Sequence, residues 1–407
     1  MRRRSILLVL IVFVVLSGPL EALVARHVSA DYQYRLTILL NLLLGTGLTA
    51  YAYLRRRSAF TAALMAAWPI LLFVSFAMAS TLWSILPQST FLAATAQIFF
   101  TLAIITTVSL INWRELLVGI ALGATVIGLL SVLLIPLGGL MTDVHEGALR
   151  GPFSEKNRAG MVYAIGAVTA LALTFEMRRM FWLILLPFFL GLLYLSQAGT
   201  SIIATGVALS TLAFCELLKD RPKRLILGSW AGTLIAAGIG VLIVSNAEAL
   251  LDLVGEDATF TGRDRIWPAV LSRIQDVIWL GYGYDAFFRA QNVGVEWLWY
   301  EVNFEVYNAH NGWLETGLSL GIIGVALLLI AVLRALAHGF IGLSGRGDAR
   351  RFLVPMMVLV LILSLTESAI GGPEGPAWLL FLMLSIKAGT RAPQTLVQKR
   401  LRPAPTW

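Results

Sequence analysis

Apolar runs of about 17–24 residues recur along the whole chain, and each is long enough to cross the hydrocarbon core of a bilayer. Only 13% of the 407 residues are charged, about half the share in a soluble domain, so water-soluble folds are excluded. The sequence therefore predicts an all-α, polytopic membrane protein with about 12 transmembrane helices. The twelve expected spans lie near residues 5–25, 36–54, 62–82, 89–110, 116–137, 159–176, 180–197, 201–218, 225–245, 312–335, 352–370 and 376–390.

The basic residues are divided unevenly between the loops on the two sides. With twelve spans, both termini and the even-numbered loops hold 22 of the 31 Lys and Arg residues, which places both termini in the cytoplasm. The acids show the opposite distribution, so the net charge of +8 reflects topology and attraction to lipid headgroups. Nucleic-acid binding is not expected. The first run could instead be a signal peptide cleaved near residues 28–30, but its length favours an uncleaved anchor.

Two loops on the outer face hold the residues that could carry chemistry. We expect nine spans in 1–245, which include the outer loop 138–158, then a large outer loop at 246–311. Three spans in 312–390 and a cytoplasmic tail at 391–407 complete the chain. The large loop is acidic and contains four Trp and four Tyr residues, which is too aromatic for a disordered segment. Within it, residues 261–283 have helical periodicity and predict an amphipathic helix at the membrane surface.

Arg263 and His310 are the two candidate catalytic residues of the large loop. Arg263 would lie in the first turn of the amphipathic helix, where free N–H groups favour an anion and a guanidinium adds a bidentate fork for phosphate. A salt bridge to a neighbouring acid is the alternative. His310 lies at the outer mouth of the next span, and an imidazole there can act as a general base. It could instead cap that helix, as could Asn308 or Asn311.

A second cationic group lies in loop 138–158. Arg150, Lys156, Asn157 and Arg158 form a candidate anion-binding site, with lipid headgroup contact as the alternative. Gly317, Gly321 and Gly324, along the span that follows His310, are expected to be positions of close helix packing.

The sequence shows no motif for a metal or cofactor. It contains no HExxH motif and no pair of His ligands, and it has a single cysteine, so neither a catalytic transition metal nor another cofactor is predicted. The interiors of the spans hold almost no charge, with Glu367 as the main exception, and this argues against an ion-coupled transporter.

Three sequence blocks resemble the O-antigen ligase and Wzy-type polysaccharide polymerase superfamily, particularly its exopolysaccharide polymerase branch. They are Phe153 with Lys156, Asn157 and Gly160; Thr261-Gly262-Arg263 with Trp267 and Gly281-Tyr282-Gly283; and His310-Asn311 with Leu314, Glu315 and Gly317. Two positions depart from the family pattern. Glu155 replaces the usual histidine. The segment Ser196–Thr200, which includes Gly199, lacks the Ser-Arg or Ser-Lys pair that family members often have there.

The resemblance implies a glycosyltransferase of the bacterial inner membrane, with the large loop in the periplasm. It implies polymerisation of undecaprenyl-pyrophosphate-linked oligosaccharide repeat units by inverting, metal-independent transfer during exopolysaccharide or O-antigen synthesis. His310 would act as the base, and Arg263 would stabilise the leaving diphosphate. The residues implied in substrate binding are Arg150, Lys156, Asn157, Arg158, Arg265 and Asn311.

The expected partners are the lipid-linked glycan and membrane lipid, with a chain-length regulator and a flippase as further candidates. Two other functions stay open at this point. One is an O-antigen ligase that passes the glycan to lipid A core or another acceptor. The other is a polytopic transporter or flippase without covalent chemistry.

Overall fold

The computed structural model describes most of the chain, including the part of the large loop that begins at Arg263. The described residues are 3–19, 23, 30–142, 145–218, 263–289, 293–344, 349–372 and 375–390. The expected span 225–245, Thr261 and Gly262 of the second motif block, most of the expected cleavage site at 28–30 and the tail 391–407 lie outside them. The division into loops and tail expected for these segments stays a prediction.

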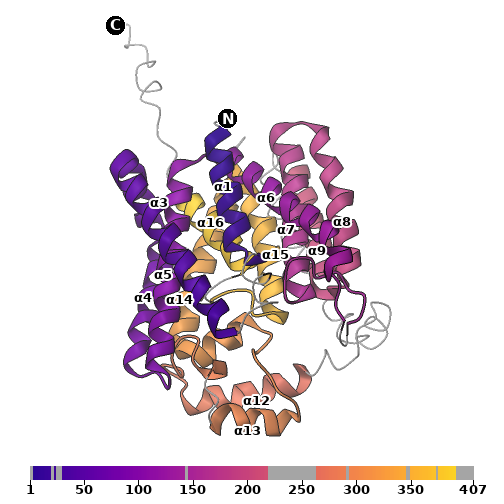
Figure 1. Ribbon diagram of the computed structural model, residues 1–407. Helices are drawn as coiled ribbons and strands as arrows, with labels where there is room; N and C mark the ends of the chain where they lie inside the picture. Colours follow the sequence, from indigo (N-terminus) through magenta and orange to yellow (C-terminus); the bar gives the residue numbers. More distant parts are fainter. Residues whose placement is uncertain are drawn as a thin grey trace, which may run out of the picture.

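The described residues form an all-α structure, as the sequence predicts, with one isolated bridge between Leu140 and Leu149. Apolar helices stand side by side as a bundle, and two further helices, α12 (Arg263–Asp276) and α13 (Val293–Val302), lie across one end of it (Figure 1). The bundle helices are α1 (Arg3–Leu16), α3 (Ala30–Ala66), α4 (Trp68–Ala79), α5 (Pro87–Leu110), α6 (Trp113–Leu134), α7 (Lys156–Met177), α8 (Leu185–Ser196), α9 (Gly199–Leu218), α14 (Gly312–Ser344), α15 (Leu353–Thr366) and α16 (Pro376–Gly389).

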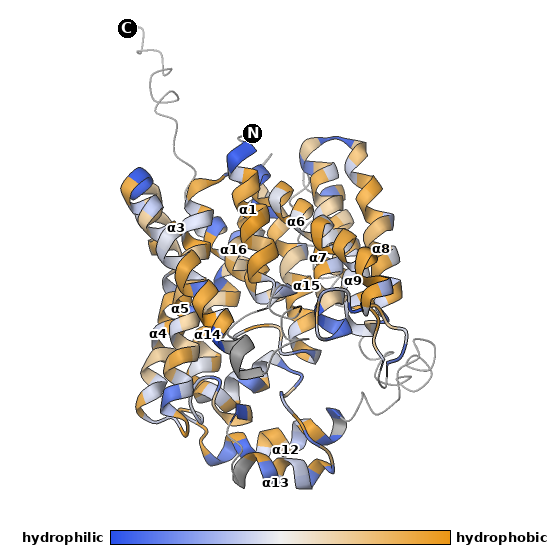
Figure 2. Cartoon of the chain, viewed as in Figure 1, coloured by the Kyte–Doolittle hydropathy of each residue, from blue (hydrophilic) through white to orange (hydrophobic). Residues whose placement is uncertain are grey.

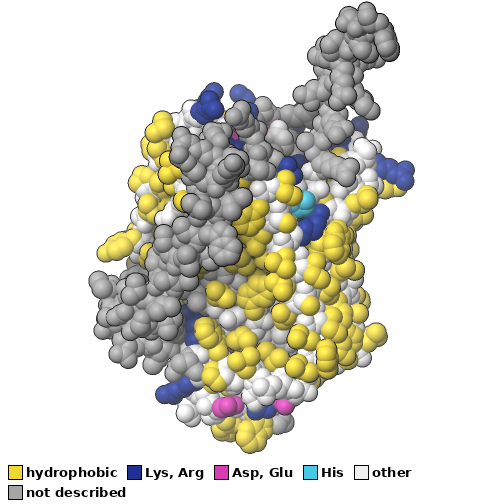
Figure 3. Space-filling view, turned by 180° about the vertical axis from the view of Figure 1, so that it is seen from behind, with side chains coloured by type: hydrophobic (Ala, Val, Ile, Leu, Met, Phe, Trp, Pro, Cys, Tyr) yellow, Lys and Arg dark blue, Asp and Glu magenta, His cyan; other side chains and the backbone are white. Residues whose placement is uncertain are grey.

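The surface of the bundle is that of a multi-pass membrane protein. Hydrophobic residues dominate its helices (Figure 2), and exposed hydrophobic side chains spread over the middle of the face seen in Figure 3. Among the residues that the structure describes, seven helices are long and apolar enough to cross a membrane, and three further apolar helices are shorter, at Trp68–Leu82, Met180–Ser196 and Pro376–Gly389. The described residues thus establish fewer full-length spans than the twelve expected.

The helix boundaries follow local sequence signals. Asn112 caps α6 by accepting the Glu115 N–H over 2.9 Å, and the Glu115 carboxylate accepts the Asn112 N–H over 3.0 Å, which forms a capping box. The expected turn between the second and third spans is very short. The helix is kinked at Arg56, whose dihedral angles (φ −145°, ψ 43°) are not helical, and α3 continues on both sides of the kink.

The short helix α16 lies in the middle of the bundle. Most of its 14 residues are buried, and it packs on α3, α5, α7, α14 and α15. Trp378 stacks on Phe381 with ring centroids 5.2 Å apart and meets the edge of Phe73 at 5.9 Å. A helix that is apolar on all sides belongs in such a buried position.

Helix α14 is broken at Gly321, where the backbone (φ 62°, ψ −165°) adopts a conformation that is almost restricted to glycine. The break frees carbonyl groups, which the Gly-Tyr-Gly motif of the large loop satisfies. The Tyr282 N–H donates to Leu318 O over 2.8 Å, and the Gly283 N–H donates to Ser319 O over 3.0 Å. The motif therefore joins the loop to the bundle through main-chain hydrogen bonds.

We expect Gly321→Ala to destabilise the protein by at least about 1–3 kcal/mol, the usual cost of such a backbone conformation for other residues. The added Cβ would also lie 2.3–2.5 Å from backbone atoms of Trp279 and Leu280, so the two segments must separate. Thermal unfolding in detergent micelles measures the loss. Gly47→Ala is the matched control, because its Cβ meets nothing within 4 Å and alanine favours a helix. Equal melting temperatures for the two variants would contradict the prediction.

A buried ion network ties the helices together at the far end of α7. Arg351 donates to Glu216 over 2.7 Å and to Glu176 over 3.1 Å, and Arg114 donates to the second oxygen of Glu176 over 2.9 Å. Glu176 lies roughly 30 Å along α7 from Asn157, as 1.5 Å per residue gives. This network is therefore remote from the residues that follow.

Candidate functional site

Three of the sequence-predicted residues meet at one buried carboxylate, that of Glu367, directly after α15. The Arg263 guanidinium donates from Nη2 to Glu367 Oε1 over 2.7 Å, and Asn157 Nδ2 donates to the same oxygen over 2.9 Å. The Nδ1 atom of His310 lies 3.6 Å from the other oxygen, Oε2. Segments more than 200 residues apart in sequence thus supply one cluster.

Helix α12 places Arg263 at its first residue, as the periodicity predicts. The apolar stripe of α12 packs in a separate small core against α13 and α14, which fixes the helix across the end of the bundle. One turn after Arg263, the Trp267 indole donates from Nε1 to Ala309 O over 3.2 Å. Because positions i and i+4 share a helix face, the same face of α12 holds Arg263 and anchors the residue before His310.

His310 occupies a left-handed backbone conformation (φ 46°) that few residues other than glycine adopt. The surrounding loop is tied down on both sides. The His310 N–H donates to Asn308 Oδ1 over 2.9 Å, and the Ala309 N–H donates to Glu315 Oε2 over 2.8 Å. Such strain tends to occur at functional positions, where the surrounding contacts maintain it.

The residue that caps α14 is Asn311, which settles one alternative left open by the sequence. Its Oδ1 accepts the N–H groups of Trp313 and Leu314 over 3.0 and 3.2 Å, and its Nδ2 donates to Leu365 O. The His310 side chain is thus not needed to start the helix.

The Lys-Asn pair at the start of α7 has two different partners. Asn157 turns toward Glu367, whereas the Lys156 ammonium, only 6% exposed, donates to Gln197 O over 3.0 Å. Gln197 is the C-cap of α8, so Lys156 neutralises the negative end of that helix. The two neighbours therefore differ in what they can offer a ligand.

The structure separates the other predicted binding residues. Arg158 lines the cavity beside Glu367. Arg150 instead donates from Nε and Nη2 to Gly138 O over 3.3 and 3.2 Å, and closes its own loop. Arg265 is exposed on α12 and does not line this cavity. The cluster thus brings together His310, Arg263 and Asn157, with Arg158 on the wall of the adjacent cavity, and the ligand roles of all eight residues stay predictions.

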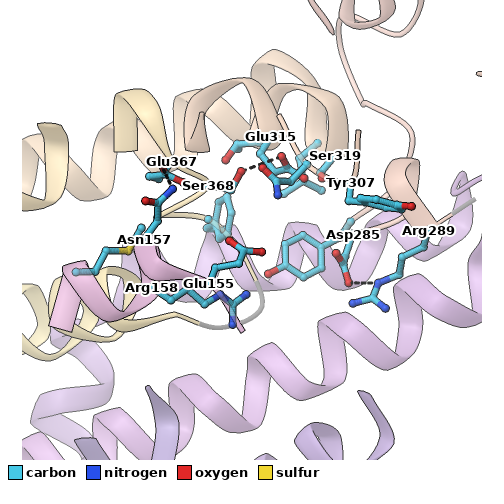
Figure 4. Close-up of a pocket in the computed structure, with 18 residues that line it drawn as sticks. Glu155, Asn157, Arg158, Asp285, Arg289, Tyr307, Glu315, Ser319, Glu367 and Ser368 are labelled. Carbon is cyan, nitrogen blue, oxygen red and sulfur yellow. Dashed lines mark hydrogen bonds and ion pairs between the residues drawn. The ribbon is translucent and has the colours of Figure 1, made fainter. Parts of the chain in front are cut away.

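A polar cavity of about 230 Å³ opens beside the cluster (Figure 4). Asn157 and Glu367 lie at one end, and the ion pair between Asp285 and Arg289, 2.6 Å long, lies at the other. Arg263 and His310 reach this wall through Glu367 and do not line the cavity themselves. Its other lining residues are Phe73, Glu155, Arg158, Met161, Tyr284, Tyr307, Asn308, Glu315, Thr316, Ser319, Leu320, Ser368, Gly371 and Gly372.

This lining suits a hydroxyl-rich ligand. Carboxylates, amides and hydroxyls offer many hydrogen-bond acceptors and donors, and tyrosine rings offer flat faces for sugar rings. A hydrogen bond to Glu305 raises the pKa of the exposed Tyr307 above the usual value of a phenol. No group of three or more His, Cys, Asp or Glu residues that could hold a metal occurs in the described part of the chain.

Glu367 is the cluster residue to which the sequence assigns no role. The sequence feature that could have identified it is its position at the end of an apolar span, where an ionisable residue is costly and usually paired. Its partners could not be predicted from the sequence because they come from three distant segments. The salt bridge from Arg263, expected to involve an acid near it in sequence, joins it instead to a residue 104 positions away.

Two comparisons with known proteins agree with the motif blocks. Residues 183–329 match the family model described as O-antigen ligase, a range that includes Arg263 and His310. The chain is also 24% identical over 283 residues to the exopolysaccharide production protein ExoQ of Rhizobium meliloti (strain 1021). That alignment covers 65% of this chain and 63% of the relative, slightly less than two thirds of each. The predicted resemblance is thereby confirmed: residues 183–329 of this multi-pass membrane protein are similar to the O-antigen ligase family, and the chain is distantly similar to a protein of exopolysaccharide production.

Proposed function

We propose that this protein polymerises undecaprenyl-pyrophosphate-linked oligosaccharide units at the periplasmic face of the bacterial inner membrane. The observation that carries the proposal is that Arg263 and His310 meet at the two oxygens of Glu367, beside a polar cavity at one end of an apolar bundle. An anion-binding group and a base next to a polar cavity are what glycosyl transfer from a diphosphate requires. The distribution of basic residues supports a periplasmic position for this end.

In the proposed reaction a hydroxyl of the acceptor sugar attacks the anomeric carbon of the donor. A new C–O bond forms as the bond from that carbon to the diphosphate oxygen breaks, and its electron pair leaves with the diphosphate. His310 takes the proton of the hydroxyl. The nucleophile enters opposite to the leaving group, so the configuration at the anomeric carbon inverts.

Arg263 would stabilise the charge that grows on the diphosphate oxygen. It is 5% exposed, and a guanidinium removed from water interacts strongly with a polyanion. Arg158 on the cavity wall is the second proposed diphosphate contact. Arg150 and Lys156 are weaker candidates, because neither lines the cavity; they donate to backbone oxygens of Gly138 and Gln197.

Turnover by the purified full-length protein in nanodiscs tests the proposal. A ladder of longer lipid-linked glycans from the donor alone supports the polymerase. Product that forms only with a separate acceptor supports the ligase, which the description of the matched family favours as the second candidate. Movement of the glycan across the bilayer without a new glycosidic bond contradicts both.

We expect glycan product to form at an unchanged rate after metal removal. Diphosphate is a good leaving group, and buried arginine can supply the positive charge that a metal would otherwise provide. Initial rates with and without excess EDTA measure the effect, and should agree within about twofold. If EDTA abolishes the reaction and only added Mg²⁺ or Mn²⁺ restores it, Arg263 does not supply this positive charge.

A further inference from the structure

Glu367 is fixed in place by its backbone as well as by its side chain. Its N–H donates to Leu363 O over 2.9 Å, and its carbonyl accepts the Gly312 N–H over 3.0 Å. The first bond closes the end of α15, and the second joins it to the start of α14. The backbone of Glu367 is therefore held in place, and its carboxylate, on a residue 6% exposed, can change partners only by rotation of the side chain.

The hydrogen bonds around this carboxylate are incomplete. Oε1 accepts from both Arg263 and Asn157, whereas Oε2 lies 3.6 Å from His310 Nδ1, which is too far for a hydrogen bond. Among the described residues, the buried Nε of Arg263 and the buried Nδ1 of His310 have no hydrogen-bond partner. Unsatisfied buried groups are costly, so both atoms favour a rearrangement that supplies an acceptor.

We propose that Glu367 is a positioning residue that exchanges Arg263 for His310 when the donor diphosphate binds. The diphosphate carries more charge than one carboxylate and matches the guanidinium fork, so it takes both Nη2 and the unpartnered Nε of Arg263. Glu367 then rotates and accepts the Nδ1–H of His310. This inference rests on the proposed function, since it assigns the diphosphate and the base as above.

The exchange prepares the base only when the donor is present. A hydrogen bond from Nδ1–H to a carboxylate fixes the imidazole tautomer and leaves Nε2 free to accept a proton. As Nε2 takes the proton of the acceptor hydroxyl, the nearby carboxylate stabilises the imidazolium. Without donor, Glu367 stays paired with Arg263, and the acceptor hydroxyl is not activated.

Glu367→Gln tests the proposal, because it should move binding and turnover in opposite directions. Arg263 loses its charged competitor, so undecaprenyl diphosphate should bind several-fold more tightly to the full-length protein in nanodiscs. The introduced amide can direct its NH₂ at His310 Nδ1, which stabilises the wrong tautomer. The kcat with lipid-linked repeat units should then fall about 10²-fold.

Glu176→Gln is the matched control. Glu176 is also a buried carboxylate that accepts from two residues, but it lies at the far end of α7. This variant should lose thermal stability while the Kd for undecaprenyl diphosphate and the kcat of the folded protein stay at wild-type values.

Glu367→Asp keeps a carboxylate and is the second test variant if Glu367→Gln does not fold. It should bind the diphosphate like the wild type and retain more kcat than the amide.

If Glu367→Gln binds the diphosphate more weakly and also has a lower kcat, the role of Glu367 is only structural, and the proposal is overturned. Unchanged kcat would also overturn it. Absence of glycan product from the wild-type protein would instead defeat the proposed function. The binding measurement would then still show whether Glu367 competes with the diphosphate for Arg263.

Discussion

Replacing His310 with asparagine is expected to lower the kcat of glycan transfer by about 10³-fold, within the range that general-base catalysis contributes. The other interactions at the site remain, because Asn311 caps α14 and Asn308 holds the backbone of residue 310. Asparagine tolerates a φ of 46° better than most residues, so the loop should keep its conformation. Single-turnover kinetics with lipid-linked repeat units measure the change directly.

Binding separates a chemical role of His310 from a structural one. The Kd for undecaprenyl diphosphate should stay within about twofold, because the proposed diphosphate contacts are Arg263 and Arg158. His145→Asn, in a turn that does not line the cavity, is the matched control and should retain full activity. More than a tenth of wild-type kcat in the His310 variant would exclude it as the base.

Arg263→Lys should reduce kcat/KM by about 10²–10³-fold, as the removal of one preorganised charge-stabilising donor does elsewhere. Lysine keeps the charge but replaces the planar fork by a single ammonium. It could pair with Glu367 or with the diphosphate, but it cannot offer two parallel donors to the leaving group. Both the Kd for undecaprenyl diphosphate and the kcat should therefore worsen.

Arg273→Lys is the control for this substitution. Arg273 lies on the same helix and pairs with Asp276 at 3.6 Å and Glu301 at 3.9 Å, well away from Glu367 along α12. Its replacement should leave kcat/KM within about twofold, since exposed ion pairs contribute little. Wild-type kinetics for Arg263→Lys would show that charge alone is sufficient and that the bidentate contact is unnecessary.

Segments with strong periodicity could be predicted from the sequence. Eleven of the twelve expected spans overlap helices in the described part of the chain, although only seven of those helices are long and apolar enough to cross a membrane, and the amphipathic helix that begins at Arg263 is present as α12. The break of α14 at Gly321 was not predicted, although close packing there was. A helix break depends on what fills it, and here the filling segment is Gly281 to Gly283, about 40 residues earlier.

The candidate site could be predicted only in part for the same reason. Chemistry-bearing residue types identified Arg263, His310 and Asn157, whose side chains converge. Lys156 was grouped with Asn157 because they are adjacent in sequence. Successive residues of a helix point about 100° apart, so neighbours in α7 face different partners. Packing between distant helices decides which side chain faces the cluster. For the same reason the role of Glu367 could not be predicted from the sequence.

The main-chain joint between the Gly-Tyr-Gly motif and the broken α14 has a consequence for evolution. Peptide groups are common to every sequence, so this attachment does not depend on which side chains surround it, provided the glycines are kept. Residues on the cavity wall such as Asp285 and Tyr307 can therefore diversify while Arg263 stays in register with His310. If the proposed function holds, the wall of the cavity can change its ligand preference by single substitutions without disturbing the relative positions of Arg263 and His310.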